Sequence, residues 1–75
     1  MAEQIADLKG LRCPLPVLKA RKLMRGLAPG DKLVLECTDP MTVIDIPNFA
    51  QQEGHILELQ ERRGEIYVYA ITKAK

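Results

Sequence analysis

The sequence contains no serine and no tryptophan, a single histidine at position 55, and two cysteines, Cys13 and Cys37. The absence of serine excludes a serine nucleophile, and one histidine excludes a zinc centre that needs two. Two cysteines with that one histidine also disfavour a four-ligand zinc site, so we expect neither a metal nor a bound cofactor. Any covalent chemistry is therefore expected at sulfur.

Long apolar runs and nucleotide-binding loops are missing as well. The longest uninterrupted apolar segment covers residues 66–71, far short of the ~18 residues that a membrane helix needs. Neither glycine-rich phosphate-binding pattern, GxxxxGK[ST] or GxGxxG, occurs. The first ten residues include Glu3 and Asp7 and lack the apolar core of a secretion signal, so we expect a cytoplasmic protein without a membrane partner.

The 75 residues, 47% hydrophobic and 28% charged, are typical of one small folded domain, here residues 1–75. Periodicity and turn residues predict the element order βαβαββ. The expected strands cover residues 5–8, 31–38, 56–60 and 66–72, and the expected helices cover residues 14–27 and about 39–54. We therefore expect an α+β fold, a two-layer α/β sandwich whose four-stranded mixed sheet carries both helices on one face.

The first expected helix is amphipathic and strongly basic. Its apolar arc consists of Pro16, Val17, Ala20, Leu23, Met24 and Leu27. The opposite side carries Lys19, Arg21, Lys22 and Arg25, together with Leu15 and Leu18, which we expect to be exposed. Residues 8–30 contain six basic and no acidic residues, a charge of +6 against −5 for the rest of the chain. This side is either a binding surface for an acidic partner, for which tRNA and an acidic protein are candidates, or a solvated helix face.

The second helix and the last strand have clear but less regular patterns. Asp39 and Pro40 are the predicted N-cap and first residue of the helix. Its expected buried residues are Val43, Ile46, Phe49 and Ala50. Pro47 predicts either a kink or a regular helix that starts near it. Tyr67 and Tyr69 share one side of the last strand, where we expect packing on the sheet face rather than base stacking.

The segment of residues 10–16, GLRCPLP, places Cys13 directly before the first helix. The helix dipole and the basic neighbours Arg12 and Lys19 predict a modestly lowered pKa for this thiol. Pro14 and Pro16 have no N–H, so among the first positions only the amide of residue 15 can reach the sulfur. The two prolines also fix the backbone and predict a stiff, exposed mount for a functional thiol. The alternative is a buried structural cysteine.

These residues resemble the TusA family, which includes the SirA and YedF proteins. The hallmark Cys-Pro-x-Pro motif is matched by Cys13, Pro14, Leu15 and Pro16, within LKGLRCPLPVLKARK at residues 8–22. Residues 27–31 (LAPGD), 38–40 (TDP) and 45–49 (DIPNF) resemble further recurring segments of the family in the same order and spacing. The resemblance implies the βαβαββ sandwich and a sulfur carrier.

In such a carrier, the resemblance implies, Cys13 accepts sulfane sulfur as a persulfide from a cysteine desulfurase or a rhodanese-like protein and relays it to an acceptor protein. The relay of TusA itself ends in 2-thiolation of the tRNA wobble uridine. Sulfur oxidation, molybdenum-cofactor maturation and selenium metabolism remain open as destinations. The resemblance implies a covalent carrier rather than a stand-alone enzyme.

Three further residues have two interpretations each. Cys37 is either a second, resolving thiol or a core residue in register with Leu33 and Leu35, and the alternation favours the core. Asp39 and Asp45 are expected near Cys13, because the first two strands are predicted to run parallel and to end at one edge of the sheet. Asp39 fits a helix cap, and Asp45 fits a structural or partner-binding role.

Two other classes of function compete with the sulfur carrier. One is a non-covalent regulatory or protein-interaction module in which Cys13 is structural. The other is a nucleic-acid-binding domain, which the near-neutral charge and the 4% aromatic content disfavour, so we expect no direct nucleic-acid binding. No second patterned surface is visible, and we expect a monomer.

Overall fold

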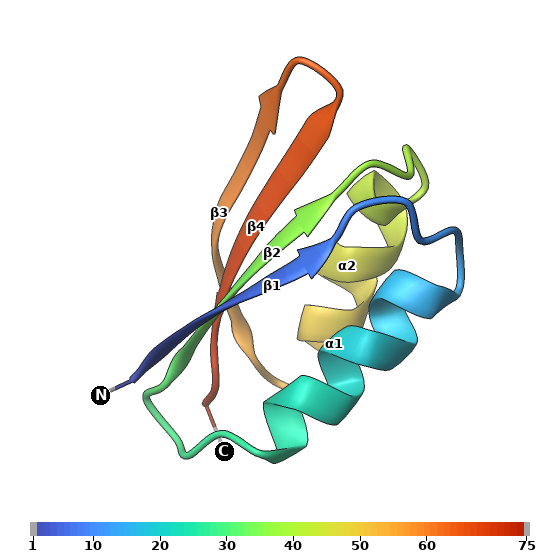
Figure 1. The fold of residues 1–75 in the computed structure, drawn as a ribbon. Helices are drawn as coiled ribbons and strands as arrows, with labels where there is room; N and C mark the ends of the chain where they lie inside the picture. The colour runs from blue at the N-terminus through green and yellow to red at the C-terminus, as the bar shows by residue number, and fades with distance from the viewer. Residues whose placement is uncertain (1, 75) are drawn as a thin grey trace.

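The structure, a computed structural model, describes residues 2–74. A four-stranded sheet carries two helices on one face (Figure 1). The elements in chain order are β1 (Glu3–Leu8), α1 (Leu15–Arg25), β2 (Lys32–Cys37), α2 (Thr42–Gln52), β3 (Ile56–Arg63) and β4 (Ile66–Thr72). The predicted βαβαββ order and the two-layer α+β sandwich are confirmed.

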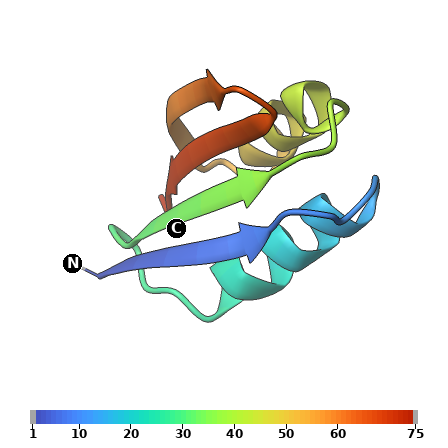
Figure 2. The ribbon, with the colours of Figure 1, turned by 45° about the horizontal axis from the view of Figure 1, so that its top comes forward.

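The strands lie in the order β1-β2-β4-β3. β1 pairs in parallel with β2, from Glu3 opposite Lys32 to Leu8 opposite Cys37, and the other two pairings are antiparallel. The sheet is therefore mixed, as predicted. Figure 2 shows α1 along the half of the sheet made by β1 and β2, and α2 toward β3 and β4. Because β1 and β2 are parallel, the segments that follow them leave the sheet at the same edge.

Strict alternation in β2 positions the core between sheet and helices. Leu33, Leu35 and Cys37 are fully buried, whereas the residues between them are half-buried on the other face. In β4, Tyr69 and Ile71 extend the same buried layer, and Tyr67 packs against it. The expected packing of the two tyrosines on the sheet face is confirmed.

Helix α1 begins at Leu15, one residue later than expected, with Pro14 as its N-cap, and ends at Arg25. Its apolar side is buried through Pro16, Ala20 and Met24. Leu15 and Leu18 are 47% and 49% exposed, as their position among the basic residues predicts. At the other end, the ammonium group of Lys73 donates hydrogen bonds to the carbonyl oxygens of Met24 (2.9 Å) and Leu27 (2.6 Å). These bonds add a charged donor to carbonyl oxygens at the C-terminal end of the helix, where a positive charge is favourable.

Helix α2 differs from the expectation at its first turn. The prediction that Asp39 and Pro40 are N-cap and first helical residue is wrong, because the N-cap is Met41 and the helix begins at Thr42. Asp39 instead accepts a hydrogen bond from the Met41 amide at Oδ1 (3.0 Å), and its carbonyl accepts one from the Thr42 hydroxyl (2.7 Å). A turn stabilised by the aspartate side chain therefore precedes the helix.

Ile46, Phe49 and Ala50 of α2 are buried as predicted, and only the buried position in the first turn differs. Thr42 occupies the buried position expected for Val43, which is 41% exposed. The reason is a polar contact in the core, since the Thr42 hydroxyl lies 2.8 Å from the Tyr69 hydroxyl. The helix continues through Pro47 to Gln52, so of the two alternatives predicted at Pro47 the start of the helix near it is wrong.

The β3–β4 hairpin is longer than expected, because β3 reaches Arg63 instead of residue 60. Gly64 adopts a φ of 63° in the turn, which favours glycine. Within residues 2–74, no helix combines the length and the apolar character needed to cross a membrane.

Candidate functional site

The site forms where the segments after β1 and β2 meet at the shared edge of the sheet. The amide of Gly10, after β1, donates a hydrogen bond to the Thr38 hydroxyl, after β2 (2.9 Å). Three residues later, the Cys13 amide donates a 2.5 Å hydrogen bond to Oδ2 of Asp39. Gly10 has a φ of 85°, which lets the first segment turn back over the second. The backbone that leads to the thiol is thus held to the segment after β2 at Gly10 and at Cys13.

The Cys13 side chain points to α2. Its thiol donates a hydrogen bond to Oδ2 of Asp45, with Sγ and oxygen 2.8 Å apart. Cys13 is exposed, whereas Asp45 is half-buried in the first turn of α2. The side chain thus combines access to solvent with one fixed polar partner.

The expected lowering of the Cys13 pKa is wrong. The hydrogen bond to Asp45 raises the pKa of the thiol, and desolvation and the negative charges of Asp45 and Asp39 add to this effect. The helix end gives no compensation, because Cys13 lies outside the helix and the Leu15 amide donates to the carbonyl of Arg12 (2.8 Å) rather than to sulfur. The unloaded thiol is consequently held in its protonated form.

The pKa of the Asp39 carboxyl group is shifted in the opposite direction, downward. Hydrogen bonds from the amides of Met41 and Cys13, with the nearby charge of exposed Arg12, lower the pKa of this carboxyl group. The carboxylate is therefore ionised over the physiological pH range, and it connects the Cys13 segment to the start of α2 from both of its oxygens.

Cys37, the second predicted thiol, lies in the core. It has no exposed surface, and burial raises the pKa of its thiol to about 11. The core placement favoured by the alternation in β2 is confirmed. In this conformation Cys37 has no access to a partner protein.

A surface cavity of about 310 Å³ lies beside Cys13, between the helices. Its lining residues are Cys13, Pro14, Val17, Asp45, Asn48, Phe49 and Gln52. Sequence reasoning missed Asn48 and Gln52. The spacing in the sequence could have identified them, because they follow Asp45 by three and seven positions and therefore share its side of the helix.

The structure separates the predicted basic partner surface into two parts. Arg21 and Arg25 line a second cavity with Phe49, and the guanidinium carbon of Arg21 lies 5.7 Å from the centre of the Phe49 ring. Lys19 and Lys22 are exposed beside Leu18 and line neither cavity. In the described part of the chain, no cluster of three or more histidine, cysteine, aspartate or glutamate side chains could hold a metal ion.

Comparisons with known proteins agree with this architecture. A family model described as sulfurtransferase TusA matches residues 4–73. The crystal structure of a SirA-like protein from Desulfitobacterium hafniense is similar with a TM-score of 0.83, covering 96% of this chain and 99% of that one at 20% identity. At that identity the structural likeness shows the fold, and the family model is what relates the sequence to sulfur transfer.

Proposed function

This chain belongs to the TusA sulfurtransferase family, and we propose that it is a sulfur carrier that holds sulfane sulfur as a persulfide on Cys13. The observation that carries the proposal is the exposed Cys13 thiol, hydrogen-bonded to the Asp45 carboxylate and mounted on a backbone that Asp39 holds. The other cysteine is buried, so a donor protein has one thiol to reach.

The chemistry that we assign to the site is thiol attack on sulfane sulfur. Sγ of Cys13 attacks the terminal sulfur of a donor persulfide, a new sulfur–sulfur bond forms at Cys13, and the donor bond breaks. The thiol proton passes to Asp45 and then to the departing donor thiolate, so no electrons enter or leave the pair of proteins. A positioned carboxylate at 2.8 Å meets the geometric requirement for this proton acceptor.

The raised pKa of the Cys13 thiol suits a carrier that must stay unreactive until it binds a donor protein. A protonated thiol is a weak nucleophile and is oxidised slowly, whereas the thiolate is the reactive form. Attack then depends on proton transfer to Asp45 when a sulfane sulfur is placed beside Cys13.

Donor and acceptor proteins are expected to dock next to the thiol. Leu15 and Leu18 provide exposed apolar area, and Lys19 and Lys22 provide positive charge on the same stretch of α1. An apolar centre with a charged rim is typical of a transient protein interface. The donors that fit are a cysteine desulfurase or a rhodanese-like protein, and the relay that we propose ends in 2-thiolation of the tRNA wobble uridine.

The experiment uses the protein with a cysteine desulfurase and cysteine. Mass spectrometry should detect a gain of about 32 Da, the mass of one sulfur, that reductant removes. Cys13→Ser should show no gain, and Cys37→Ala should still be loaded. Absence of the adduct in the folded wild-type protein would instead support a non-covalent regulatory or interaction module.

A further inference from the structure

Two cavities lie one after the other along the groove between α1 and α2. The cavity of about 310 Å³ beside Cys13 and a cavity of about 210 Å³ farther along share Phe49 in their walls. On α1, the wall continues from Val17 in the first cavity to Arg21 in the second, one helical turn later. The thiol therefore lies at one end of a groove whose other end is the second cavity.

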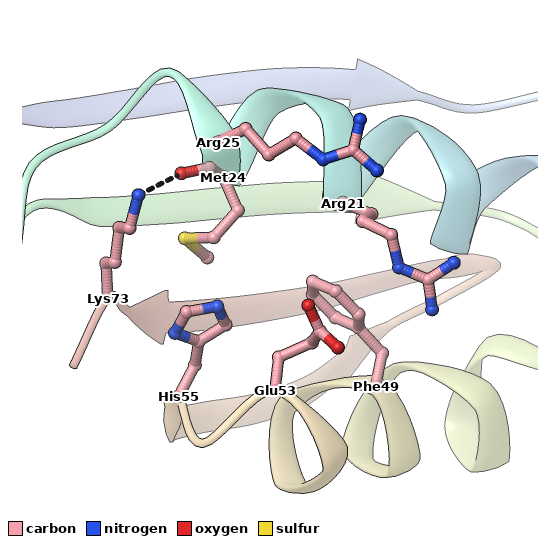
Figure 3. A pocket seen from close by; sticks show the side chains of 7 residues that line it. All are labelled: Arg21, Met24, Arg25, Phe49, Glu53, His55 and Lys73. Atoms are coloured by element: carbon pink, nitrogen blue, oxygen red, sulfur yellow. Dashed lines mark hydrogen bonds between the residues drawn. The ribbon is translucent and has the colours of Figure 1, made fainter. Parts of the chain in front are cut away.

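The second cavity is charged in a specific arrangement. Figure 3 shows Arg21 and Arg25 on the α1 side, with Phe49, Glu53 and His55 across from them and Lys73 at one end. Between residues 2 and 74, neither arginine forms an ion pair, and Glu53 forms none either. Arg21 is half-buried against the Phe49 ring, which limits its freedom.

The other polar groups of the cavity have partners that define their state. The Lys73 ammonium group is engaged with two carbonyl oxygens of α1. Nδ1 of His55 accepts a hydrogen bond from the Ala74 amide (3.4 Å), so the neutral ring carries its proton on Nε2. Partial burial lowers the pKa of His55, which keeps the ring neutral at physiological pH. Two guanidinium groups and one carboxylate thus remain available to a ligand.

Two cations opposite one carboxylate, with Arg21 packed on the Phe49 ring and Arg25 exposed, match the headgroup of a free amino acid. Its carboxylate can bind the guanidinium groups of Arg21 and Arg25 in the paired geometry that arginine favours, and its ammonium group can bind Glu53. The path from Pro14 to Arg21 covers seven residues of α1, about 10 Å along the axis, which equals about three extended residues. Val17 and Phe49 provide apolar walls between the two ends.

We propose that this groove binds a low-molecular-weight, peptide-like persulfide through an amino-acid headgroup at Arg21, Arg25 and Glu53, with its sulfur at Cys13. This site gives the carrier a small-molecule sulfur donor besides its protein partners, and it rests on the proposed persulfide on Cys13. The ligand's sulfur–sulfur bond breaks, the terminal sulfur bonds to Cys13, and the Cys13 proton leaves with the ligand as a thiol. The exchange needs no added oxidant or reductant.

The first test measures binding without sulfur transfer. S-methylglutathione, an unreactive γ-glutamyl tripeptide with such a headgroup, is titrated into isotope-labelled Cys13→Ser protein and followed by nuclear magnetic resonance. We expect saturable shifts at Val17, Arg21, Phe49 and Glu53. Combined Arg21→Gln and Arg25→Gln substitution should weaken binding about tenfold, equivalent to ~1.4 kcal/mol. Combined Lys19→Gln and Lys22→Gln substitution, with the same charge loss on the same helix, should change it less than about twofold.

A second probe tests the headgroup itself. The analogue of S-methylglutathione that lacks only the α-amino group should bind the wild-type groove more weakly, and Glu53→Gln should remove this difference. Absence of saturable shifts, equal weakening by the arginine and lysine pairs, or equal affinity for the two ligands would overturn the proposal.

An assay of sulfur transfer from glutathione persulfide distinguishes the groove proposal from the proposed function as a sulfur carrier. Wild-type protein should gain one sulfur, and the arginine pair variant should gain it about tenfold more slowly at low ligand concentration. One outcome is that a desulfurase loads the wild-type protein and the arginine pair variant while glutathione persulfide transfers sulfur to both at the same rate. In that case the groove proposal is wrong and the proposed function as a sulfur carrier is retained. If the tripeptide binds but Cys13 takes sulfur from neither donor, the persulfide assignment is wrong and a ligand site remains.

Discussion

The thiol of Cys13 donates a hydrogen bond to the carboxylate of Asp45 over 2.8 Å, although 32 positions separate the two residues in the chain. The contact exists because β1 and β2 are parallel, so that α1 and α2 both begin at the same edge of the sheet. It gives an exposed sulfur a raised pKa, the reverse of what a basic helix N-terminus would give. Accessibility and ionisation of the thiol are therefore controlled by different parts of the fold.

Asp45→Asn should lower the Cys13 pKa and make the thiol react at lower pH. The substitution removes the carboxylate that raises this pKa, and the new amide can donate a hydrogen bond to the thiolate. The rate of alkylation by iodoacetamide, measured from pH 6 to 10, should therefore rise at lower pH than in the wild-type protein. Glu65→Gln removes the same charge at the exposed hairpin turn and should leave the profile in place. Coincident wild-type and Asp45→Asn profiles would contradict the role of this hydrogen bond.

Asp39→Ala should destabilise the fold at pH 7, because the amides of Cys13 and Met41 lose a charged acceptor. The Asp39 pKa is lowered in the fold, so its contribution is present above the pKa of the unfolded carboxyl group and is lost as the pH falls through the folded one. Urea denaturation should show a difference between wild type and variant that shrinks in acid. Asp39→Asn, which keeps one oxygen acceptor, should destabilise the fold less than Asp39→Ala does.

The sequence was sufficient for the fold because each element carried its own pattern. Alternation placed Leu33, Leu35 and Cys37 in the core, and helical spacing left Leu15 and Leu18 exposed, as observed. The site depended on contacts between distant segments. The proximity of residues 13 and 45 could be expected from parallel strands, but the sign of the pKa shift depends on where the carboxylate points, which no local pattern encodes.

The start of α2 also depends on a contact between distant segments that no local sequence pattern predicts. Asp39 and Pro40 form a good cap by propensity, yet the helix begins at Thr42, whose hydroxyl contacts that of Tyr69, and Thr42 is buried in place of Val43. Likewise, a helical wheel places Arg21 and Arg25 nearer to Val17 than Lys22, but it does not show which residue faces them across the groove. The role of the two arginines follows from the position of Phe49 on the neighbouring helix.

Combined Lys19→Glu and Lys22→Glu substitution should slow sulfur loading by a cysteine desulfurase severalfold at low salt and much less at 0.5 M salt. Long-range attraction between docking surfaces is screened by salt, whereas the chemistry at Cys13 is not. The initial rate of mass gain at the two salt concentrations measures this. Loading of the same variant by glutathione persulfide should change little, because neither lysine lines the groove. A loss of rate that is equal at both salt concentrations would contradict docking through this surface.

Thr42→Val should destabilise the protein by about 1–3 kcal/mol although it preserves side-chain volume. The substitution leaves the buried Tyr69 hydroxyl without its partner and removes a donor from the Asp39 carbonyl. Tyr69→Phe should cost less, because Thr42 keeps its bond to Asp39. Denaturation of both single variants and of the double variant gives the coupling between the hydroxyl groups, which should be about 1 kcal/mol. Additive single effects would show that the 2.8 Å contact contributes nothing.

Cys37 should make stability depend on pH in alkaline solution. Burial raises the pKa of its thiol from near 9 to about 11, so the folded protein keeps a proton that the unfolded chain releases. The stabilisation is complete below pH 9 and is lost as the pH rises to 11, because the unfolded state ionises first.

The measurement is urea denaturation at several pH values between 8 and 11, performed in Cys13→Ser protein so that only one thiol titrates. Cys37→Ala in that background should be less stable by about 1 kcal/mol at pH 8, since a buried side chain is shortened. Its stability should then fall less steeply with pH, so that the two curves converge. The tyrosines and lysines are common to both proteins and cancel in the difference. Parallel curves across this range would mean that the Cys37 thiol ionises as readily in the fold as in the unfolded chain.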